Sequence, residues 1–179
     1  MSIDTVQQYG GAEGYVSGAV SGLVAGIVAG GILHYGANLV ELLCALAPHY
    51  GPHAVVGIGW VVHLIVSVAF ALVFVSIVSS RSVAEHVTSV TDFGYVGVLF
   101  GAFFALFAAG VLYPAGMRIA GVAALPEPFV SVPGVADEFL TALVFAVGYL
   151  VYGLVLATTF ALIRDAVPVG PPEHVVIRE

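Results

Sequence analysis

The sequence predicts an all-helical integral membrane protein with four transmembrane helices. Of its 179 residues, 60% are hydrophobic and 8% are charged, whereas soluble domains average roughly 45–50% and about 25%. Apolar runs at about 15 to 35, 54 to 79, 93 to 113 and 138 to 163 each have about the 20 residues that a helix needs to cross a bilayer. We therefore expect a single membrane domain over residues 1–179, in contact with the lipid bilayer.

The charge of the chain excludes one class of partner. Its net charge is −7, because it has eleven Asp and Glu residues but only four Arg and Lys residues. Nucleic-acid binding needs clustered Lys or Arg to neutralise phosphates, so no nucleic-acid partner is expected. No basic residue precedes the first apolar run, which argues against a cleaved signal peptide and predicts that the first span stays in the mature protein.

The first span carries glycine at every fourth position. These glycines are Gly14, Gly18, Gly22, Gly26 and Gly30. Residues four apart lie on one face of a helix, and small residues on such a face let another transmembrane helix approach closely. We expect this glycine face to pack against other helices, either within the chain or in a homo-oligomer or larger membrane complex.

Between the first two spans lies a shorter apolar segment at 37–47. Asn38 and Glu41 are spaced like an N-terminal capping pair, and Pro48 would end the helix. About ten residues cannot cross a bilayer, so a short interfacial or re-entrant helix is expected. Thr91 and Asp92 are expected to cap the third span and Asp137 the fourth, and residues 165–179 are expected to form a flexible tail.

The chain also shows signs of an internal repeat. A gap-free offset pairs Gly18 with Gly97 and Gly22 with Gly101, and after a short insertion a slightly larger offset pairs Phe70 with Tyr152. This predicts two tandem repeats, at about 14–80 and about 93–164, each made of a span, a short interfacial or re-entrant helix and a span. Because each unit has two spans, the two repeats would be parallel in the membrane.

The few arginines indicate an orientation in the cell membrane. Arg81, Arg164 and Arg178 would lie on one side and Arg118 on the other. Because arginine concentrates in cytoplasmic loops, the N- and C-termini are expected to be cytoplasmic, and the two short helices extracytoplasmic.

His63 is the most suggestive single residue, because an ionisable side chain within a span is costly and indicates function by default. It shares a helix face with Trp60, and the matching face of the fourth span carries Tyr149 and Tyr152. Two largely aromatic faces with one histidine could flank a flat cofactor such as haem. A neutral histidine that bonds Ser67, a tyrosine or a carbonyl across a helix interface accounts for the same residues.

Three other histidines form a candidate metal site in the first extracytoplasmic connection: His34, His49 and His53. Imidazoles suit copper or zinc. Gly51 and Pro52 interrupt the helix that would place His49 and His53 on one face, and solvated loop histidines are the alternative. His34 and His63 differ in depth by roughly 13 Å at 1.5 Å per residue, too far for both to bind one iron.

The remaining polar residues give little sign of catalysis. Asp137 and Glu138 could gate a cation path, or could simply favour the start of the fourth helix. The sequence has no phosphate-binding loop, no His-Glu-x-x-His motif and no Gly-x-Ser-x-Gly motif. We therefore expect a protein that is not an enzyme and has no catalytic residue.

The glycine-rich first span, followed by Gly59-Trp60-Val61-Val62-His63 in the second, resembles a family of small multipass haloarchaeal and bacterial membrane proteins with no assigned activity. Such proteins are similar to small accessory subunits found with haem-copper terminal oxidases. The resemblance implies no catalytic residue, and only Trp60 and His63 match its pattern.

The leading hypothesis is a non-catalytic accessory or assembly subunit of a respiratory, terminal oxidase-like membrane complex. Low polarity within the spans favours this role over transport, because ion paths normally show rings of charge or exposed carbonyls. Two alternatives stay open: a small channel or transporter that acts as an oligomer, and a haem- or metal-binding redox protein that uses His63.

Overall fold

The structure is a computed structural model that describes residues 9–37, 44, 47, 49–121, 128 and 131–164. The long helices are α2 (Ala12–Gly36), α4 (Pro52–Val78), α6 (Val90–Phe107) and α8 (Asp137–Ile163). A π-helical turn, η1 (Ala108–Leu112), joins α6 to α7 (Tyr113–Ala120), and the short helix α5 (Arg81–Ala84) follows α4. In this part of the chain four helical units, at 12–36, 52–78, 90–119 and 137–163, are long and apolar enough to cross a membrane. The prediction of an all-helical, multi-pass membrane protein is confirmed.

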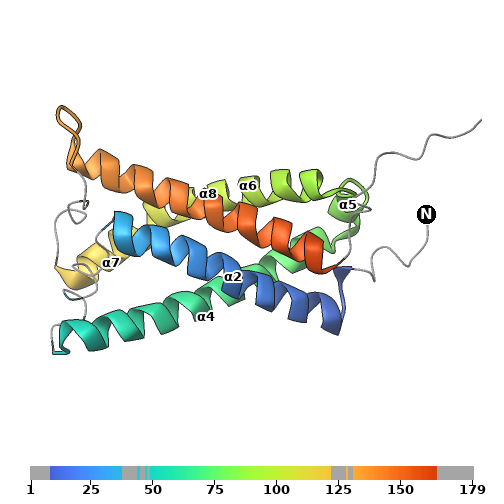
Figure 1. Cartoon of the computed structure of the whole chain (residues 1–179), viewed down its shortest axis with the longest axis horizontal. Coiled ribbons are helices and arrows are strands. Elements are labelled where there is room, and N and C mark those ends of the chain that lie inside the picture. Colours follow the sequence, from blue (N-terminus) through green and yellow to red (C-terminus); the bar gives the residue numbers. More distant parts are fainter. Residues whose placement is uncertain are drawn as a thin grey trace, which may run out of the picture.

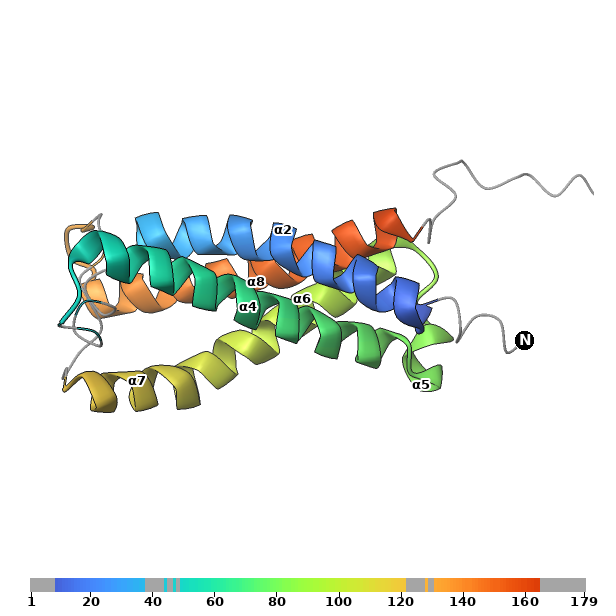
Figure 2. The same cartoon turned by 90° about the horizontal axis from the view of Figure 1, so that it is seen from below.

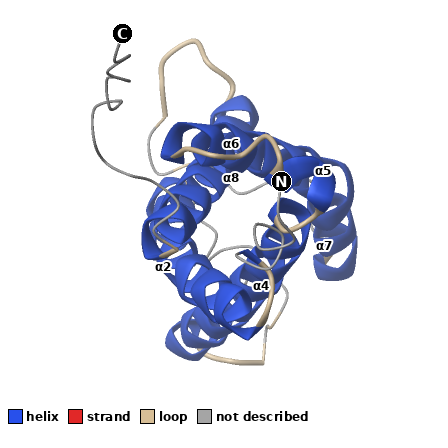
Figure 3. Ribbon diagram, turned by 90° about the vertical axis from the view of Figure 1, so that its right-hand side faces the viewer, coloured by secondary structure: helices blue, strands red, loops and turns tan. Residues whose placement is uncertain are grey.

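The four spans are arranged side by side around a common axis (Figure 3). Helix α2 packs against both α4 and α8, and α8 packs in turn against α6. Each of these neighbours runs antiparallel to the next, and α5 lies at the same end of the bundle as the start of α2 and the end of α8 (Figure 1). The C-terminal ends of α2 and α7 lie at the opposite end (Figure 1).

The glycine face of α2 is turned inward. Its buried glycines are Gly14, Gly18, Gly22, Gly26 and Gly30. A Cβ atom at Gly22 would lie 2.5 Å from the Cβ of Ala71 and 3.1 Å from the carbonyl oxygen of Ser67. Ordinary carbon–carbon contacts are about 3.5–4.0 Å, so α2 and α4 are closer than side chains at these positions would permit.

Helices α6 and α8 meet in the same way. A Cβ atom at Gly97 would clash with the carbonyl oxygen of Gly153 and lie 2.5 Å from the Cβ of Ala157, and one at Gly101 would clash with the carbonyl oxygen of Tyr149. Because the obstacles include backbone atoms, no rotamer change could relieve them.

The two glycine contacts correspond position by position. Gly18 faces the side chain of Val75 and the carbonyl of Ala71, while Gly97 faces Ala157 and the carbonyl of Gly153. Their partners are related by the offset that pairs Phe70 with Tyr152. Gly22 and Gly101 likewise face the carbonyls of Ser67 and Tyr149, which the same offset relates.

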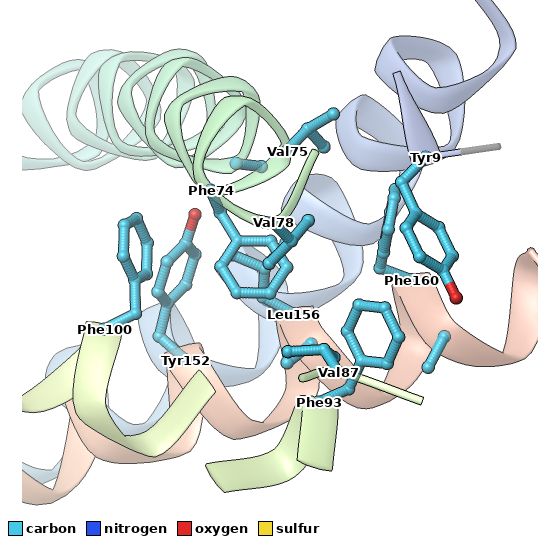
Figure 4. Close-up of a cluster of buried hydrophobic side chains, with 14 of the residues drawn as sticks. Tyr9, Phe74, Val75, Val78, Val87, Phe93, Phe100, Tyr152, Leu156 and Phe160 are labelled. Atoms are coloured by element: carbon cyan, nitrogen blue, oxygen red, sulfur yellow. The ribbon is translucent and has the colours of Figure 1, made fainter. Parts of the chain in front are cut away.

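The main hydrophobic core joins side chains of all four spans and includes Ala84 of α5; Figure 4 shows part of it. Phe74, Phe93 and Phe160 are fully buried there, with ring centroids 6.1 Å apart for Phe74 and Phe160 and 5.9 Å apart for Phe93 and Phe160. Tyr9, just before α2, makes an edge contact to Phe93 at 5.4 Å. Burial raises the pKa of the Tyr9 phenol above its ordinary value, so Tyr9 is neutral at physiological pH.

The helix starts differ in part from the sequence expectation. Ser89, rather than Thr91, is the N-cap of α6, and its hydroxyl accepts a hydrogen bond from the Asp92 amide while the Asp92 carboxylate accepts one from the Ser89 amide. This reciprocal pair is a capping box. The expectation that Asp137 caps α8 is wrong, because the N-cap is Ala136, which makes no side-chain cap, and Asp137 is the first helical residue.

The third span is longer than the apolar run at 93 to 113 predicts. The π-helical turn carries the chain past Gly110, and α7 continues beyond Tyr113 to a C-cap glycine, Gly121, with a φ of 67°. Along α7 the chain diverges from α4 (Figure 2). The short helix expected at 37–47 and the tail at 165–179 lie outside the described residues, apart from Ala37, Cys44 and Ala47.

Candidate functional site

His63 lies in the middle of α4 and faces α2. Its Nε2 atom is 3.0 Å from the carbonyl oxygen of Gly26. A carbonyl oxygen only accepts hydrogen bonds, so Nε2 carries the proton and donates. In the neutral ring this leaves Nδ1 as an unprotonated acceptor.

The rings of Trp60 and His34 lie next to His63, in that order, toward the end of the bundle remote from α5. Trp60 lies about one helical turn before His63, with ring centroids 6.0 Å apart, and His34 from the last turn of α2 lies 6.1 Å from Trp60. A Cβ atom at Gly30 would be 2.7 Å from the indole ring. The bare backbone at Gly30 therefore makes room for Trp60, which stands between the two histidines.

These three rings border a cavity with a volume of about 550 Å³. It lies between the end of α2 and the start of α4, and Tyr50 and Ala47 from their connection complete its wall. We call it the α2–α4 cavity. Its volume falls within the range of about 300–1,000 Å³ typical of small-molecule sites, which are largely apolar with a few polar groups.

Tyr149 and Tyr152 lie at a second, smaller cavity inside the bundle, which holds about 60 Å³ and is also bordered by His63 and Ser67. The Tyr152 hydroxyl donates to the carbonyl oxygen of Ser67 at 2.5 Å. The hydroxyls of Tyr149 and Tyr113 are hydrogen-bonded to each other at 2.9 Å. Both tyrosines thus connect α8 to neighbouring elements, and neither borders the α2–α4 cavity.

The structure does not bring the predicted metal ligands together. His34 is half-buried against Trp60, whereas His49 and His53 are exposed at the start of α4 and the turn before it. Among the described residues no group of three His, Cys, Asp or Glu side chains is placed to hold a metal ion.

The geometry is also poorly suited to haem at His63. Haem iron is held by a nitrogen or sulfur ligand such as histidine, and Nε2 of His63 already donates to Gly26. Coordination through that atom would require the loss of this hydrogen bond and of its proton. Trp60 and His63 instead share the wall of a cavity suited to a ligand that forms hydrogen bonds.

Sequence reasoning missed the contact between Tyr113 and Tyr149 and the participation of His34 and Tyr50 in the α2–α4 cavity. One signal was present, because the repeat offset places Tyr113 opposite His34. This offset indicated that Tyr113 and His34 occupy related positions, but it did not indicate which aromatic rings each of them would contact.

Comparison with known families, curated proteins and solved structures finds no match to the chain.

Proposed function

We propose that the protein is a non-catalytic accessory or assembly subunit of a respiratory, terminal oxidase-like membrane complex. The main support is the close packing of the spans, which leaves little open space among them. Backbone-level contacts join α2 to α4 and α6 to α8, and the described cavity among all four spans holds only about 60 Å³. Ion paths need rings of charge or exposed carbonyls, and the carbonyl of Ser67, a residue that borders this cavity, already accepts a hydrogen bond from Tyr152.

The outer surface supports partnership with lipid and with other transmembrane helices. Only about 28% of the most apolar window is buried within the bundle for α4 and for the span from α6 to α7. Large side chains such as Leu99 and Leu106 are 70% and 75% exposed. Apolar surface of this kind is compatible both with lipid and with the helices of a larger complex.

The proposal includes the two-repeat architecture. Equivalent glycines meet equivalent partners in the two halves, as Gly18 with Ala71 and Val75 and Gly97 with Gly153 and Ala157. This correspondence supports parallel tandem units, because unrelated glycine-rich helices need not share partner positions. Cytoplasmic termini are supported by Arg81 in α5 and Arg164 at the end of α8, which lie at one end of the bundle, opposite Arg118 in α7 (Figure 1).

Native co-purification tests this role. The chain, tagged at its C-terminus and expressed at its natural level, is extracted from its own membrane in a mild detergent, and the co-purifying subunits are identified by mass spectrometry. The accessory role predicts stoichiometric recovery of respiratory subunits. A control membrane protein with the same tag should not recover them. Recovery of a lone oligomer that conducts ions in liposomes would contradict the proposal and support the channel alternative.

A further inference from the structure

We propose that the α2–α4 cavity binds one molecule of a lipid-soluble quinone, a neutral planar ring with two carbonyl oxygens and an apolar tail. This inference goes beyond the accessory role and does not depend on it. It rests on how the cavity opens, which groups line it and how the matching place in the second half of the chain is filled.

The cavity opens toward lipid. Its wall includes Ile58 and Val62 of α4, which are 52% and 53% exposed on the outer surface of the bundle. The described lining contains no Lys, Arg, Asp or Glu. A charged ligand would find no counter-charge among these residues, whereas a neutral ligand dissolved in the bilayer could enter past the exposed side chains of α4.

The polar side chains of the described lining are the rings of Trp60, His34 and His63, which carry nitrogen atoms, and the phenol of Tyr50. The indole N–H of Trp60 makes no hydrogen bond with any described residue, and it can donate to a quinone carbonyl. His34 supplies a second imidazole at the same wall. Nδ1 of His63 is an acceptor while Nε2 donates to Gly26, which suits a hydroxyl of the reduced ring.

The corresponding place in the second half is filled by side chains. The repeat offsets pair His34 with Tyr113 and His63 with Phe145. The rings of Tyr113 and Phe145 pack with centroids 4.3 Å apart, and the Tyr113 hydroxyl is bonded to Tyr149. The open cavity and its two histidines therefore do not follow from the helix packing that both halves share, and a ligand accounts for their presence in one half.

A quinone fits these features better than a lipid acyl chain does. An acyl chain would fill the apolar space but would offer no hydrogen-bond partner to the ring nitrogens of Trp60 and His34 or to Nδ1 of His63, and unpaired polar groups in an apolar surrounding are costly. A quinone ring can pack against the indole and offer its oxygens to these nitrogens.

The cavity carries its own optical probe, because Trp60 is the single tryptophan of the chain. The purified full-length protein in lipid nanodiscs is titrated with decylubiquinone while tryptophan fluorescence is recorded. Quinones quench indole emission on contact, so binding in the cavity predicts saturable quenching at one quinone per chain.

Two substitutions keep Trp60 and remove one ligand-binding ring each. His63→Phe installs the residue type found at the matching position of the second half, and His34→Phe leaves the Gly26 hydrogen bond in place. Each should weaken quinone binding roughly fivefold to tenfold, the effect of one lost hydrogen bond. Tyr113→Phe, at the position matching His34, is the control and should leave quinone binding unchanged. If His63→Phe does not fold, His34→Phe carries the test.

Three results would overturn the proposal. Quenching that rises linearly with quinone and is equal in all variants would show partition into lipid only. Saturable quenching that neither His34→Phe nor His63→Phe weakens would place the quinone elsewhere. Displacement of decylubiquinone by oleate at equal concentration would identify a site for acyl chains. Because the measurement uses the isolated chain, its outcome is independent of the co-purification test.

Discussion

Replacement of Gly97 by alanine should destabilise the bundle, although alanine is the better helix former. The new Cβ would clash with the carbonyl oxygen of Gly153 and lie 2.5 Å from the Cβ of Ala157. Ordinary carbon–carbon contacts are about 3.5–4.0 Å, so α6 and α8 must separate by roughly 1 Å. Overpacking of this kind typically costs about 1–3 kcal/mol.

The matched control is Gly116→Ala in the same span, where a Cβ would meet nothing within 4 Å. Both substitutions gain the same helix propensity, about 1 kcal/mol in water. Their difference therefore isolates the clash, and Gly97→Ala should be less stable than Gly116→Ala by about 1–3 kcal/mol. Gly18→Ala should fall between them, because its Cβ would press mainly on the Val75 side chain, which can shift more easily than a carbonyl.

Reversible unfolding in mixed micelles with rising SDS, followed by far-ultraviolet circular dichroism, measures these free energies of unfolding. Linear extrapolation to zero SDS gives the comparison between variants. Equal stabilities for Gly97→Ala and Gly116→Ala would refute the close approach of α6 and α8, and with it the packing role assigned to the glycine positions.

The same unfolding assay checks three further predictions. In a double-mutant cycle, Tyr113→Phe and Tyr149→Phe should show a coupling of roughly 0.6 kcal/mol, typical of hydrogen bonds between membrane helices, and additive effects would argue against the 2.9 Å bond. Ser89→Ala should cost about 1 kcal/mol through loss of the capping box, whereas Thr91→Ala, outside the cap, should cost little; equal losses would contradict the assigned cap. Phe160→Ala should cost about 3–5 kcal/mol, because its ring is fully buried, and a loss below about 1 kcal/mol would be inconsistent with that burial.

The spans could be predicted from the sequence because bilayer thickness imposes a length that apolar runs display directly. The end of the third span was harder to locate. Tyr113, Pro114 and Arg118 resemble the end of a helix, yet a π-helical turn precedes them and the chain continues to Gly121. Pro114 lacks the amide that would continue the helical hydrogen-bond pattern, and the π-helical turn directly before α7 is where the regular α-helical pattern changes.

The candidate site was predictable only in part. A histidine within a span is visible in any sequence, so His63 was an evident candidate. Depth along separate helices placed His34 and His63 too far apart to share one ion, but it could not indicate that Trp60 bridges them. That arrangement depends on the register of α4 against α2, which places the indole ring over Gly30. Register follows from close contacts along the whole interface, and a sequence does not display it.

The α2–α4 pair and the α6–α8 pair differ most where close packing does not restrict the residue type. At Gly18, Gly22, Gly97 and Gly101 any side chain would meet the facing helix, so the residue type is restricted in both halves. At the end of the bundle remote from α5 this restriction no longer applies. There Tyr113 packs against Phe145 on one side. On the other side the rings of His34, Trp60 and His63 border a cavity of about 550 Å³. Because the Gly26 carbonyl accepts a hydrogen bond from Nε2 of His63 within the close-packed stretch, the close packing of α2 and α4 also fixes Nδ1 as the imidazole nitrogen that remains an acceptor. The shared packing thus sets the chemistry that the unshared cavity can offer to a ligand.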